Sequence, residues 1–442
     1  MQKRTKHSLV SLAALFAFAA AFGETTVSDI IVRQQWPWKT QLNADFLIGG
    51  STGAVTQVTL NAYQGDTFLG QIPPGVCEGG TVVTSNGLYR ISFDPSQVDF
   101  LVARGPMNDF RLDVSVQDVP PEEILYMIFD LRKVPGEANQ VQYVTERDLT
   151  NGVWGAWERD YWGTELARTV IWTGVTNDVK YASTHLVMRR IPEGTFQFGT
   201  ATDSPAHDDN DTFATSVTIS KPYYMGVFEF TQAQCKLLSD ITLDVSEEST
   251  RPSNYKYYGY KNTMEDIRGK LAIWPEVEDD VDSRTIIGVL RARTGVAGFD
   301  LPTEAQWEKA ARAGSTGTYY TSNGTALSST TVKQIARAAQ STGNTYVEAG
   351  SFKPNAYGLY DVLGNLWEIV LDWIDEEGAY VPDSIDPKGP LTGEKRVLKG
   401  GYYYTKASGT SILHLSQRMG AALNVSNGQK TQYGYRVCCP AP

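Results

Sequence analysis

The sequence predicts an α+β protein, in which an all-β sandwich precedes a domain rich in irregular structure. Residues 55–62 (VTQVTLNA) and 88–93 (LYRISF) alternate apolar and polar side chains, as half-buried strands do. Other short apolar runs of the first part are bounded by Pro, Asp, Asn and Gly, which is typical of a β-sandwich. Farther along, a few strongly patterned blocks are separated by polar segments. We therefore expect a β-sandwich over residues 24–183 and a second domain over residues 184–442.

Length and charge narrow the classes of protein that fit. A chain of 442 residues is long enough for about two or three domains, each with its own core. It has 39 basic and 50 acidic residues, a formal net charge of −11. We expect no nucleic-acid partner, because such binding depends on Lys and Arg side chains that neutralise phosphates.

Residues 1–23 have the pattern of a secretory signal peptide. Basic residues lie within the first six positions, and an apolar run covers residues 9–22. The small residues Ala21 and Gly23 stand two apart before the expected cleavage site. The apolar run is short for a membrane span, and no later segment reaches the length of one. We expect an exported protein without a transmembrane span, periplasmic or secreted after cleavage.

The second domain contains one helix whose start is specified by its own residues. Thr303 and Gln306 have the spacing of a capping box, and Glu308 and Arg312 are spaced as an i,i+4 ion pair. A second helix is expected over residues 232–239. Long segments around so few helices predict a domain that depends on local fasteners such as metal ions.

The four cysteines are too few and too scattered for a dense disulfide framework. They are Cys77, Cys235, Cys438 and Cys439, with no CxxC pair of the kind that binds zinc. Neighbouring cysteines rarely bridge each other, because the geometry strains the backbone. The spacing allows one bridge from Cys235 to either Cys438 or Cys439, and the sequence does not decide whether it forms.

Six ordered blocks of the second domain carry a family resemblance. They are residues 188–199 (MRRIPEGTFQFG), 221–232 (KPYYMGVFEFTQ), 301–314 (LPTEAQWEKAARAG), 355–368 (NAYGLYDVLGNLWE), 397–401 (VLKGG) and 433–436 (YGYR). Together they resemble the sulfatase-modifying factor family, which contains the formylglycine-generating enzymes. The resemblance implies a compact variant of the C-type lectin fold for residues 184–442, and it does not extend to residues 24–183.

The resemblance also implies one Ca²⁺ ion. In the family the G-N-x-W-E block surrounds calcium, and by position the ligands here are Asp361, the main-chain carbonyls of Gly364 and Leu366, and Glu368. Ca²⁺ prefers several hard oxygens and accepts carbonyls, which suits this set. Without the surrounding blocks, the two carboxylates would be assigned only to capping a turn. A second calcium site found in some members is not expected, because Arg337 stands near its Asn position and a guanidinium cannot coordinate a cation.

The catalytic thiols of the family's copper enzymes have no counterpart in this sequence. Those enzymes bind copper with two cysteines shortly after R-G-G, and Thr405 and Thr410 stand in these places. Soft thiolates suit Cu(I) and a hydroxyl does not. Cys438 and Cys439 follow the last block and do not match the pair. We therefore expect no copper and assign no catalytic residue.

The segment that follows Gly401 is rich in tyrosines and polar side chains, which suit a recognition surface. It places Tyr433 32 positions after Gly401, as in the long-form branch of the family, which includes ligand-binding members. The alternative is that its tyrosines pack in the core against Trp367 and Trp373 and that its arginine pairs with a buried carboxylate. The binding-surface candidates are Tyr402, Tyr403, Tyr404, His414, Gln417 and Arg418.

Three functions remain after these steps. The leading one is an exported, calcium-stabilised, non-catalytic binding or scaffold module for an unidentified protein or glycan. The alternative is a formylglycine-generating oxidase that converts a sulfatase active-site cysteine, with the sulfatase as its partner. That oxidase would need another copper arrangement, for example one built on Cys438 and Cys439. A third possibility is a structural envelope protein in which the domain is a spacer.

Overall fold

The structure is a computed structural model of the chain. The residues it describes are 25–34, 40–50, 55–73, 76–78, 81–83, 86–104, 107–119, 123–137, 140–150, 158–159, 170–200, 214–238, 265–269, 271, 274–276, 278–320, 329–339, 345–374, 382–405, 413–423 and 432–441. The expected signal peptide at residues 1–23 and Thr410 lie outside this set.

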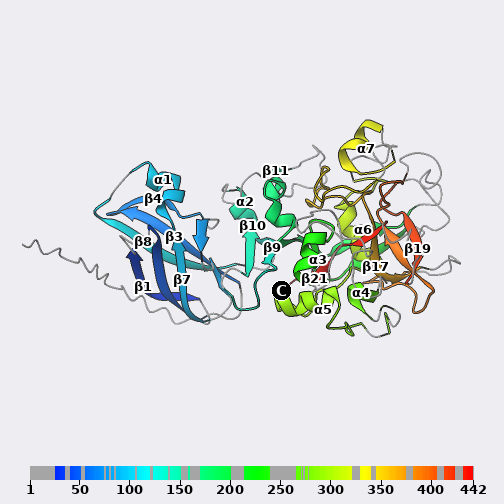
Figure 1. Ribbon diagram of the computed structural model, residues 1–442, viewed down its shortest axis with the longest axis horizontal. Coiled ribbons are helices and arrows are strands. Elements are labelled where there is room, and N and C mark those ends of the chain that lie inside the picture. The colour runs from blue at the N-terminus through cyan, green and yellow to red at the C-terminus, as the bar shows by residue number, and fades with distance from the viewer. Residues whose placement is uncertain are drawn as a thin grey trace, which may run out of the picture.

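The N-terminal part consists of two sheets packed over one apolar core (Figure 1). One sheet has the order β1-β2-β7-β5, and the other has the order β4-β3-β6 with β8 paired to β3. Alternate residues of β3 are buried, as its sequence pattern predicts, and they meet side chains of β2 and β7 across the core. The bounds are β1 Thr26–Gln34, β2 Leu42–Gly49, β3 Thr56–Gln64, β4 Thr67–Gln71, β5 Cys77–Glu78, β6 Val82–Val83, β7 Gly87–Phe93, β8 Phe110–Asp118 and the short α1 Asp99–Val102.

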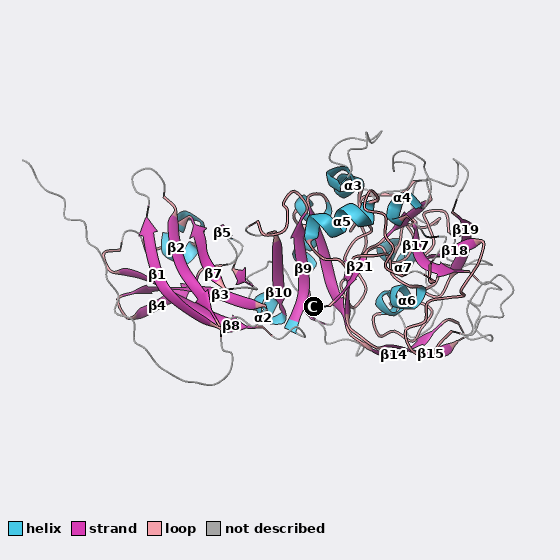
Figure 2. Ribbon diagram, turned by 90° about the horizontal axis from the view of Figure 1, so that it is seen from below, coloured by secondary structure: helices cyan, strands magenta, loops and turns pink. Residues whose placement is uncertain are grey.

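A five-stranded antiparallel sheet in the order β10-β9-β13-β16-β21 follows, and β9 and β10 lie between the N-terminal sheets and the rest of the chain (Figures 1 and 2). Its strands are β9 Ile124–Asp130, β10 Val141–Thr145, β13 His185–Ile191, β16 Tyr223–Gly226 and β21 Cys438–Pro440, and α2 Glu146–Thr150 follows β10.

This sheet crosses the boundary expected between residues 183 and 184, because β9 pairs with β13 along five residue pairs. Along β9, Tyr126 and Ile128 enter one core cluster while Met127 and Phe129 enter another. A strand covered on both faces loses the alternation of a sandwich strand. The two-sheet N-terminal unit thus ends with β8, and β9 and β10 are built into the following unit.

The described residues of the rest of the chain form small sheets, five helices and long connections, so the predicted α+β class with a β-rich N-terminal region is confirmed. Among the described residues, no helix is long and apolar enough to cross a membrane. The remaining strands are β11 Glu158–Arg159, β12 Val170–Ile171, β14 Gly194–Phe198, β15 Thr215–Ile219, β17 Trp367–Trp373, β18 Lys395–Lys399, β19 Arg418–Ala422 and β20 Tyr433–Tyr435. The helices are α3 Gln232–Leu238, α4 Glu265–Arg268, α5 Ile286–Thr294, α6 Glu304–Arg312 and α7 Ser329–Ile335, and 3₁₀ turns cover Pro95–Gln97, Thr173–Thr176 and Val179–Ala182.

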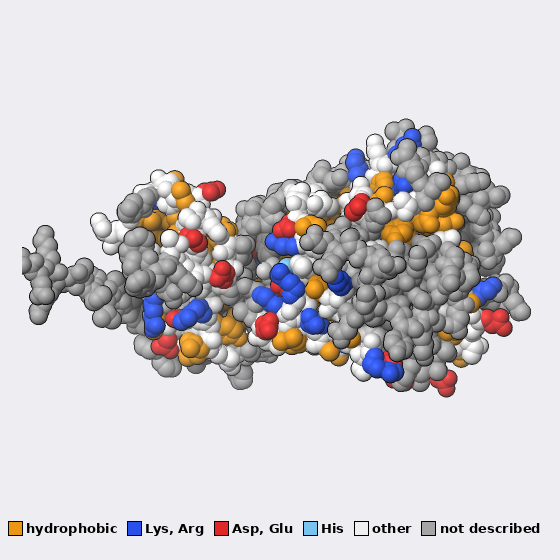
Figure 3. All heavy atoms as spheres, in the orientation of Figure 1, with side chains coloured by type: hydrophobic (Ala, Val, Ile, Leu, Met, Phe, Trp, Pro, Cys, Tyr) orange, Lys and Arg blue, Asp and Glu red, His pale blue; other side chains and the backbone are white. Residues whose placement is uncertain are grey.

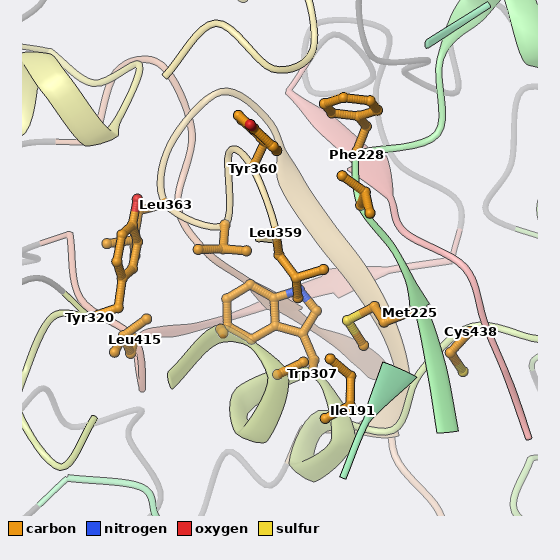
Figure 4. Packing of buried hydrophobic residues seen from close by; sticks show 14 of the residues in the cluster. Ile191, Met225, Phe228, Trp307, Tyr320, Leu359, Tyr360, Leu363, Leu415 and Cys438 are labelled. Carbon is orange, nitrogen blue, oxygen red and sulfur yellow. The ribbon is translucent and has the colours of Figure 1, made fainter. Parts of the chain in front are cut away.

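Helix α6 supplies the centre of the larger core. The predicted capping box is present, with Thr303 and Gln306 each accepting the other's backbone N–H, and the Arg312–Glu308 ion pair measures 2.7 Å. Trp307 projects from this helix into a group of aliphatic side chains (Figure 4). The labelled neighbours of its ring are Ile191, Met225, Leu359 and Leu363. The second predicted helix is also present, as α3.

All four cysteines are free thiols, so the bridge that the spacing allowed is not formed. The Cys235 thiol lies 3.2 Å from the Tyr435 hydroxyl instead. Cys438 and Cys439 are adjacent on β21 and enter different core clusters, since neighbouring strand residues point to opposite faces.

Candidate functional site

A tight turn between Tyr360 and β17 carries the expected calcium ligands. Asp361, Gly364 and Asn365 have φ values of 55°, 82° and 59°, in the left-handed region. At Gly364 a Cβ atom would lie 2.2 Å from the Arg337 carbonyl oxygen, so only glycine fits there. The Gly364 N–H donates to the Gly400 carbonyl at 2.8 Å and the Asn365 N–H to the Arg337 carbonyl at 2.9 Å. The turn is therefore held from two sides by segments distant in sequence.

Three carboxylates gather behind this turn. Glu229, Asp361 and Glu368 are buried, and Arg436 is buried among them. Burial, followed by the charges of Glu368 and Asp361, raises the pKa of Glu229 well above its ordinary value. Burial also raises the pKa of Asp361, to about 7. One guanidinium does not balance three carboxylates, so the cluster has an excess of negative charge when all three are ionised.

Glu368 is held in place by two buried donors. Arg436 binds it through Nη2 and Nε, at 2.8 Å and 3.1 Å, and the Trp307 indole N–H donates to it at 2.7 Å. Arg436 also donates to the carbonyls of Gly226 and Val227 at 2.8 Å and 2.9 Å. Three blocks of the family resemblance, residues 221–232, 355–368 and 433–436, therefore meet at Arg436.

One carboxylate oxygen of this turn is left without a protein partner in the part of the chain that the structure describes. The Oδ2 atom of Asp361 accepts the Gly350 N–H at 2.6 Å, whereas its buried Oδ1 has no hydrogen-bond partner among the described residues. No three His, Cys, Asp or Glu side chains in the described part of the chain form a metal-binding group on their own. A cation here would therefore depend on the carbonyls of Gly364 and Leu366 together with the carboxylates, and oxygen donors of both kinds suit Ca²⁺.

Asn365 links the acidic cluster to a group of tyrosines. Its Nδ2 donates to Glu229 at 2.6 Å, and Glu229 also accepts the Leu366 N–H at 3.1 Å. Its Oδ1 accepts the Val347 N–H at 2.9 Å, and its carbonyl accepts the Tyr403 N–H at 3.0 Å. Sequence reasoning placed Glu229 and Asn365 inside matching blocks and gave them no role. The available signal was an acidic residue in an otherwise apolar run of the 221–232 block.

Tyr402, Tyr403 and Tyr404, here called the tyrosine cluster, pack against one another beside this turn. The ring centroids of Tyr402 and Tyr403 lie 5.2 Å apart, those of Tyr403 and Tyr404 lie 5.1 Å apart, and those of Tyr402 and Tyr404 lie 6.0 Å apart. Tyr402 stacks on Trp367 with centroids 6.3 Å apart, and Tyr346 packs against Tyr403. Tyr403 is 8% exposed and Tyr404 is 45% exposed. The cluster is thus anchored in the core at one end and reaches solvent at the other.

The other three surface candidates lie in the interior. His414, Gln417 and Arg418 are buried, and the Arg418 guanidinium pairs with Glu304 at 2.9 Å. The same carboxylate accepts from Lys399 at 3.2 Å, within a buried network at the start of α6. For Arg418 the geometry is therefore that of the alternative, an arginine paired with a buried carboxylate. The register of β18 and β19, which places Arg418 opposite Lys399, directs it there.

Comparison with known proteins identifies the family. The profile of the sulfatase-modifying factor enzyme 1-like domain matches residues 177–439, more than half of the chain. The chain belongs to this family. The recognition from the six blocks is thereby confirmed.

Several relatives are formylglycine-generating enzymes. The enzyme of Streptomyces coelicolor is 32% identical over 140 residues, which cover 30% of this chain and 45% of that enzyme. The enzyme of Thermomonospora curvata is 34% identical over 159 residues, which cover 33% of this chain and 50% of that enzyme. The chain spans about half the length of these curated relatives. Among solved structures, Treponema denticola variable protein 1 has 23% identity and a TM-score of 0.41, over 58% of this chain and 96% of its own.

Thr405 stands where the resemblance to the family's copper enzymes places a thiol. Its hydroxyl oxygen accepts the Tyr402 N–H at 2.9 Å, and its own N–H donates to the Tyr402 carbonyl at 2.8 Å. Its carbonyl accepts the Ala339 N–H at 3.0 Å. The residue closes the turn that carries the tyrosine cluster.

Arg337 is the residue that the sequence places near a second calcium position of some family members. The Arg337 side chain donates from Nε to the Thr345 carbonyl at 2.8 Å, and Arg337 is buried. The expectation that this position binds no second calcium ion stays a prediction.

Proposed function

We propose that this chain is an exported, non-catalytic member of the sulfatase-modifying factor enzyme 1-like family that serves as a calcium-stabilised binding or scaffold module. The observation that carries the proposal is the role of Thr405. Its hydroxyl accepts the Tyr402 N–H and so supports the tyrosine cluster, at a position where a copper oxidase needs a thiolate. A hydroxyl is a hard donor and a poor ligand for Cu(I).

The remaining thiols do not offer a substitute pair. Burial raises the pKa of Cys438 well above its ordinary value, and burial also raises the pKa of Cys439. A thiolate is the form that binds metal, whereas both cysteines are held as protonated thiols. The two thiols also enter different core clusters, so neither can approach a metal beside the other without rearrangement of β21.

Asp361, the carbonyls of Gly364 and Leu366, and Glu368 would hold the calcium ion. When bound, Ca²⁺ supplies the positive charge that the acidic cluster lacks. The protein's own part is to keep the ligands in place: Arg436 and Trp307 orient Glu368, and the Glu229–Asn365 hydrogen bond fixes the turn.

The exposed end of the tyrosine cluster is the surface that we assign to ligand recognition, with a protein or glycan as partner. Tyrosine rings supply a large contact area with few rotatable bonds and a hydroxyl at the tip. His414, Gln417 and Arg418 are buried, so we leave them out of this surface.

The non-catalytic assignment is tested with the purified mature protein, copper, a thiol reductant and a sulfatase-type Cys-x-Pro-x-Arg peptide. Mass spectrometry should find the cysteine unchanged, while a formylglycine-generating enzyme converts the same peptide in parallel. Conversion above the no-protein control would overturn the assignment and establish the oxidase alternative instead.

The calcium assignment is tested by thermal unfolding in Ca²⁺, in Mg²⁺ and in chelator. At a calcium concentration about 100 times the dissociation constant, the stabilisation should be about 2.7 kcal/mol. Asp361→Asn should reduce the shift, and Asp372→Asn, a matched change of another buried aspartate, should leave it intact. An equal shift in Asp361→Asn and the unsubstituted protein would refute the ligand assignment.

A further inference from the structure

The turn that carries the expected calcium ligands also supports the tyrosine cluster. Asn365 is fully buried and lies between Gly364 and Leu366, the two residues whose carbonyls we assign to the ion. Its own carbonyl accepts the Tyr403 N–H at 3.0 Å. The residue between two assigned ligands therefore holds the backbone of the cluster, and the two sites share one short segment of chain.

The side chains of the next two residues extend this contact. Leu366 packs in one small apolar group with Tyr346 and Tyr403. The ring of Trp367 is stacked on that of Tyr402, with centroids 6.3 Å apart. A movement of this part of the turn would therefore move the side chains against which the tyrosines pack.

Residues 345–350 form a second segment that is attached to the same turn, at two points. The Val347 N–H donates to the Asn365 Oδ1 atom at 2.9 Å, and the Gly350 N–H donates to the Asp361 Oδ2 atom at 2.6 Å. The tyrosine of this segment packs against the tyrosine cluster. Both stretches of chain that hold the cluster are therefore fixed to the ligand-bearing turn.

The charge behind the turn is unbalanced unless a cation is bound. On the face shown in Figure 3 basic and acidic side chains are interspersed, whereas the buried carboxylates of Glu229, Asp361 and Glu368 share one buried guanidinium among the described residues, that of Arg436. Buried like charges repel strongly, because the protein interior screens them less than water does. Glu229 is bonded to the side-chain amide of Asn365 at 2.6 Å, so a displacement of this carboxylate acts directly on the residue that connects the two sites.

We propose that the tyrosine surface is regulated by calcium. The turn keeps one arrangement when its cation site is filled, and this arrangement orders the tyrosine cluster, which then binds its partner more tightly. The inference rests on the calcium site and the tyrosine surface of the proposed function, and it adds the connection between them through Asn365. Because such a coupling is reciprocal, a partner that binds the ordered cluster raises the affinity for calcium by the same factor.

Hydrogen exchange of the mature protein with and without Ca²⁺, followed by mass spectrometry, tests the connection. At a calcium concentration about 100 times the dissociation constant, openings that require release of the ion become up to about 100-fold rarer, so exchange at the Tyr403 and Val347 amides should slow by about 10- to 100-fold. The control is the Thr218 amide, which donates to the Ser384 carbonyl at 2.8 Å and belongs to neither site. Its exchange should slow much less.

Asn365→Gly tests the connecting residue itself. Glycine accepts the left-handed φ of 59° and keeps the carbonyl that holds Tyr403, while the side-chain bonds to Glu229 and Val347 are lost. Because Asn365 also supports the ligand-bearing turn, each protein is measured at about 100 times its own dissociation constant for calcium. The slowing at Tyr403 should then be about tenfold weaker in the variant, the effect of losing about one hydrogen bond.

The outcomes separate this inference from the proposed function. If calcium shifts thermal unfolding and leaves exchange at Tyr403 and Val347 unchanged, the calcium site stands and the connection is refuted. Equal slowing at Thr218, or equal slowing at Tyr403 with and without the Asn365 side chain, also refutes it. If calcium has no effect on thermal unfolding, the calcium assignment fails and the inference fails with it. The comparison in the unsubstituted protein decides the matter even if the variant does not fold.

Discussion

Replacing Arg436 with methionine is expected to destabilise the protein by about 3–5 kcal/mol, the usual result of removing one partner from a buried ion pair. The fully buried guanidinium makes two bonds to Glu368 and three to the carbonyls of Gly226, Val227 and Tyr360, all between 2.8 Å and 3.1 Å. Methionine fills much of the stem volume but leaves an uncompensated carboxylate and three carbonyls without these donors. The lost hydrogen bonds to the carbonyls add to the destabilisation, so about 3 kcal/mol is the smallest loss that we expect.

Urea unfolding followed by tryptophan fluorescence measures this loss, with Lys333→Gln as the control. The decisive comparison is the double variant Glu368→Gln, Arg436→Met. It removes the stranded charge, while the amide oxygen that replaces the carboxylate can still accept the Trp307 N–H, so the double variant should be more stable than Arg436→Met alone. A loss below about 1 kcal/mol for the single variant, or a double variant that is no more stable, would refute the role assigned to the pair.

Three further predictions concern single side chains. Burial raises the pKa of Asp372 to about 7, so ionisation of this carboxyl lowers the stability of the folded protein as the pH rises from about 4 to 7. In thermal scans, Asp372→Asn should flatten that decline. Above pH 7 the variant should be more stable than the unsubstituted protein. Burial lowers the pKa of His185 to about 4, so stability should be lost as the pH falls from about 6.5 to 4, and a His185→Gln profile parallel to that of the unsubstituted protein would contradict this. Thr405→Val should cost about 1–2 kcal/mol and speed hydrogen exchange at the Tyr402 amide, and unchanged exchange would contradict the turn-closing role.

The features that could be predicted from the sequence are those that short segments determine. The start of α6 depends on Thr303 and Gln306, three residues apart, and the Glu308–Arg312 pair on one turn of helix. The strand alternation of β3 is equally local. Such elements depend on contacts between residues that are close in the sequence, so the local sequence is enough to predict them.

The features that were missed depend on pairing between distant segments. The expected boundary at residues 183 and 184 failed to anticipate the pairing of β9 with β13, because the apolar run of β9 predicts a strand and not its neighbour. Arg418 was placed among surface candidates, and the pairing of β19 with β18 brings it to Glu304. Which face of a strand is buried depends on register, and register is fixed by the partner strand.

The candidate site shows the same division. Asp361 and Glu368 were predicted as ligands from one contiguous block, whereas Glu229 and Arg436 come from blocks more than 200 residues apart and were assigned no role. Only the folded chain shows that Glu229 fixes the ligand-bearing turn and that Arg436 orients Glu368. Sequence blocks thus suggest candidate ligands that are close together, and they leave out the side chains that hold those candidates.

Asn365 gives a physical reason to regard the acidic cluster and the tyrosine cluster as one unit. Two hydrogen bonds, from Asn365 to Glu229 and from the Tyr403 N–H to the Asn365 carbonyl, connect them. We therefore expect a change of charge among the carboxylates to affect the tyrosines through the buried Asn365. Thr405 closes the other end of the same segment with its hydroxyl, which an oxidase would need as a thiol. Both ends of the segment that carries the tyrosine cluster are thus fixed by hydrogen bonds, and the recognition role that we propose depends on this fixed, partly exposed aromatic surface.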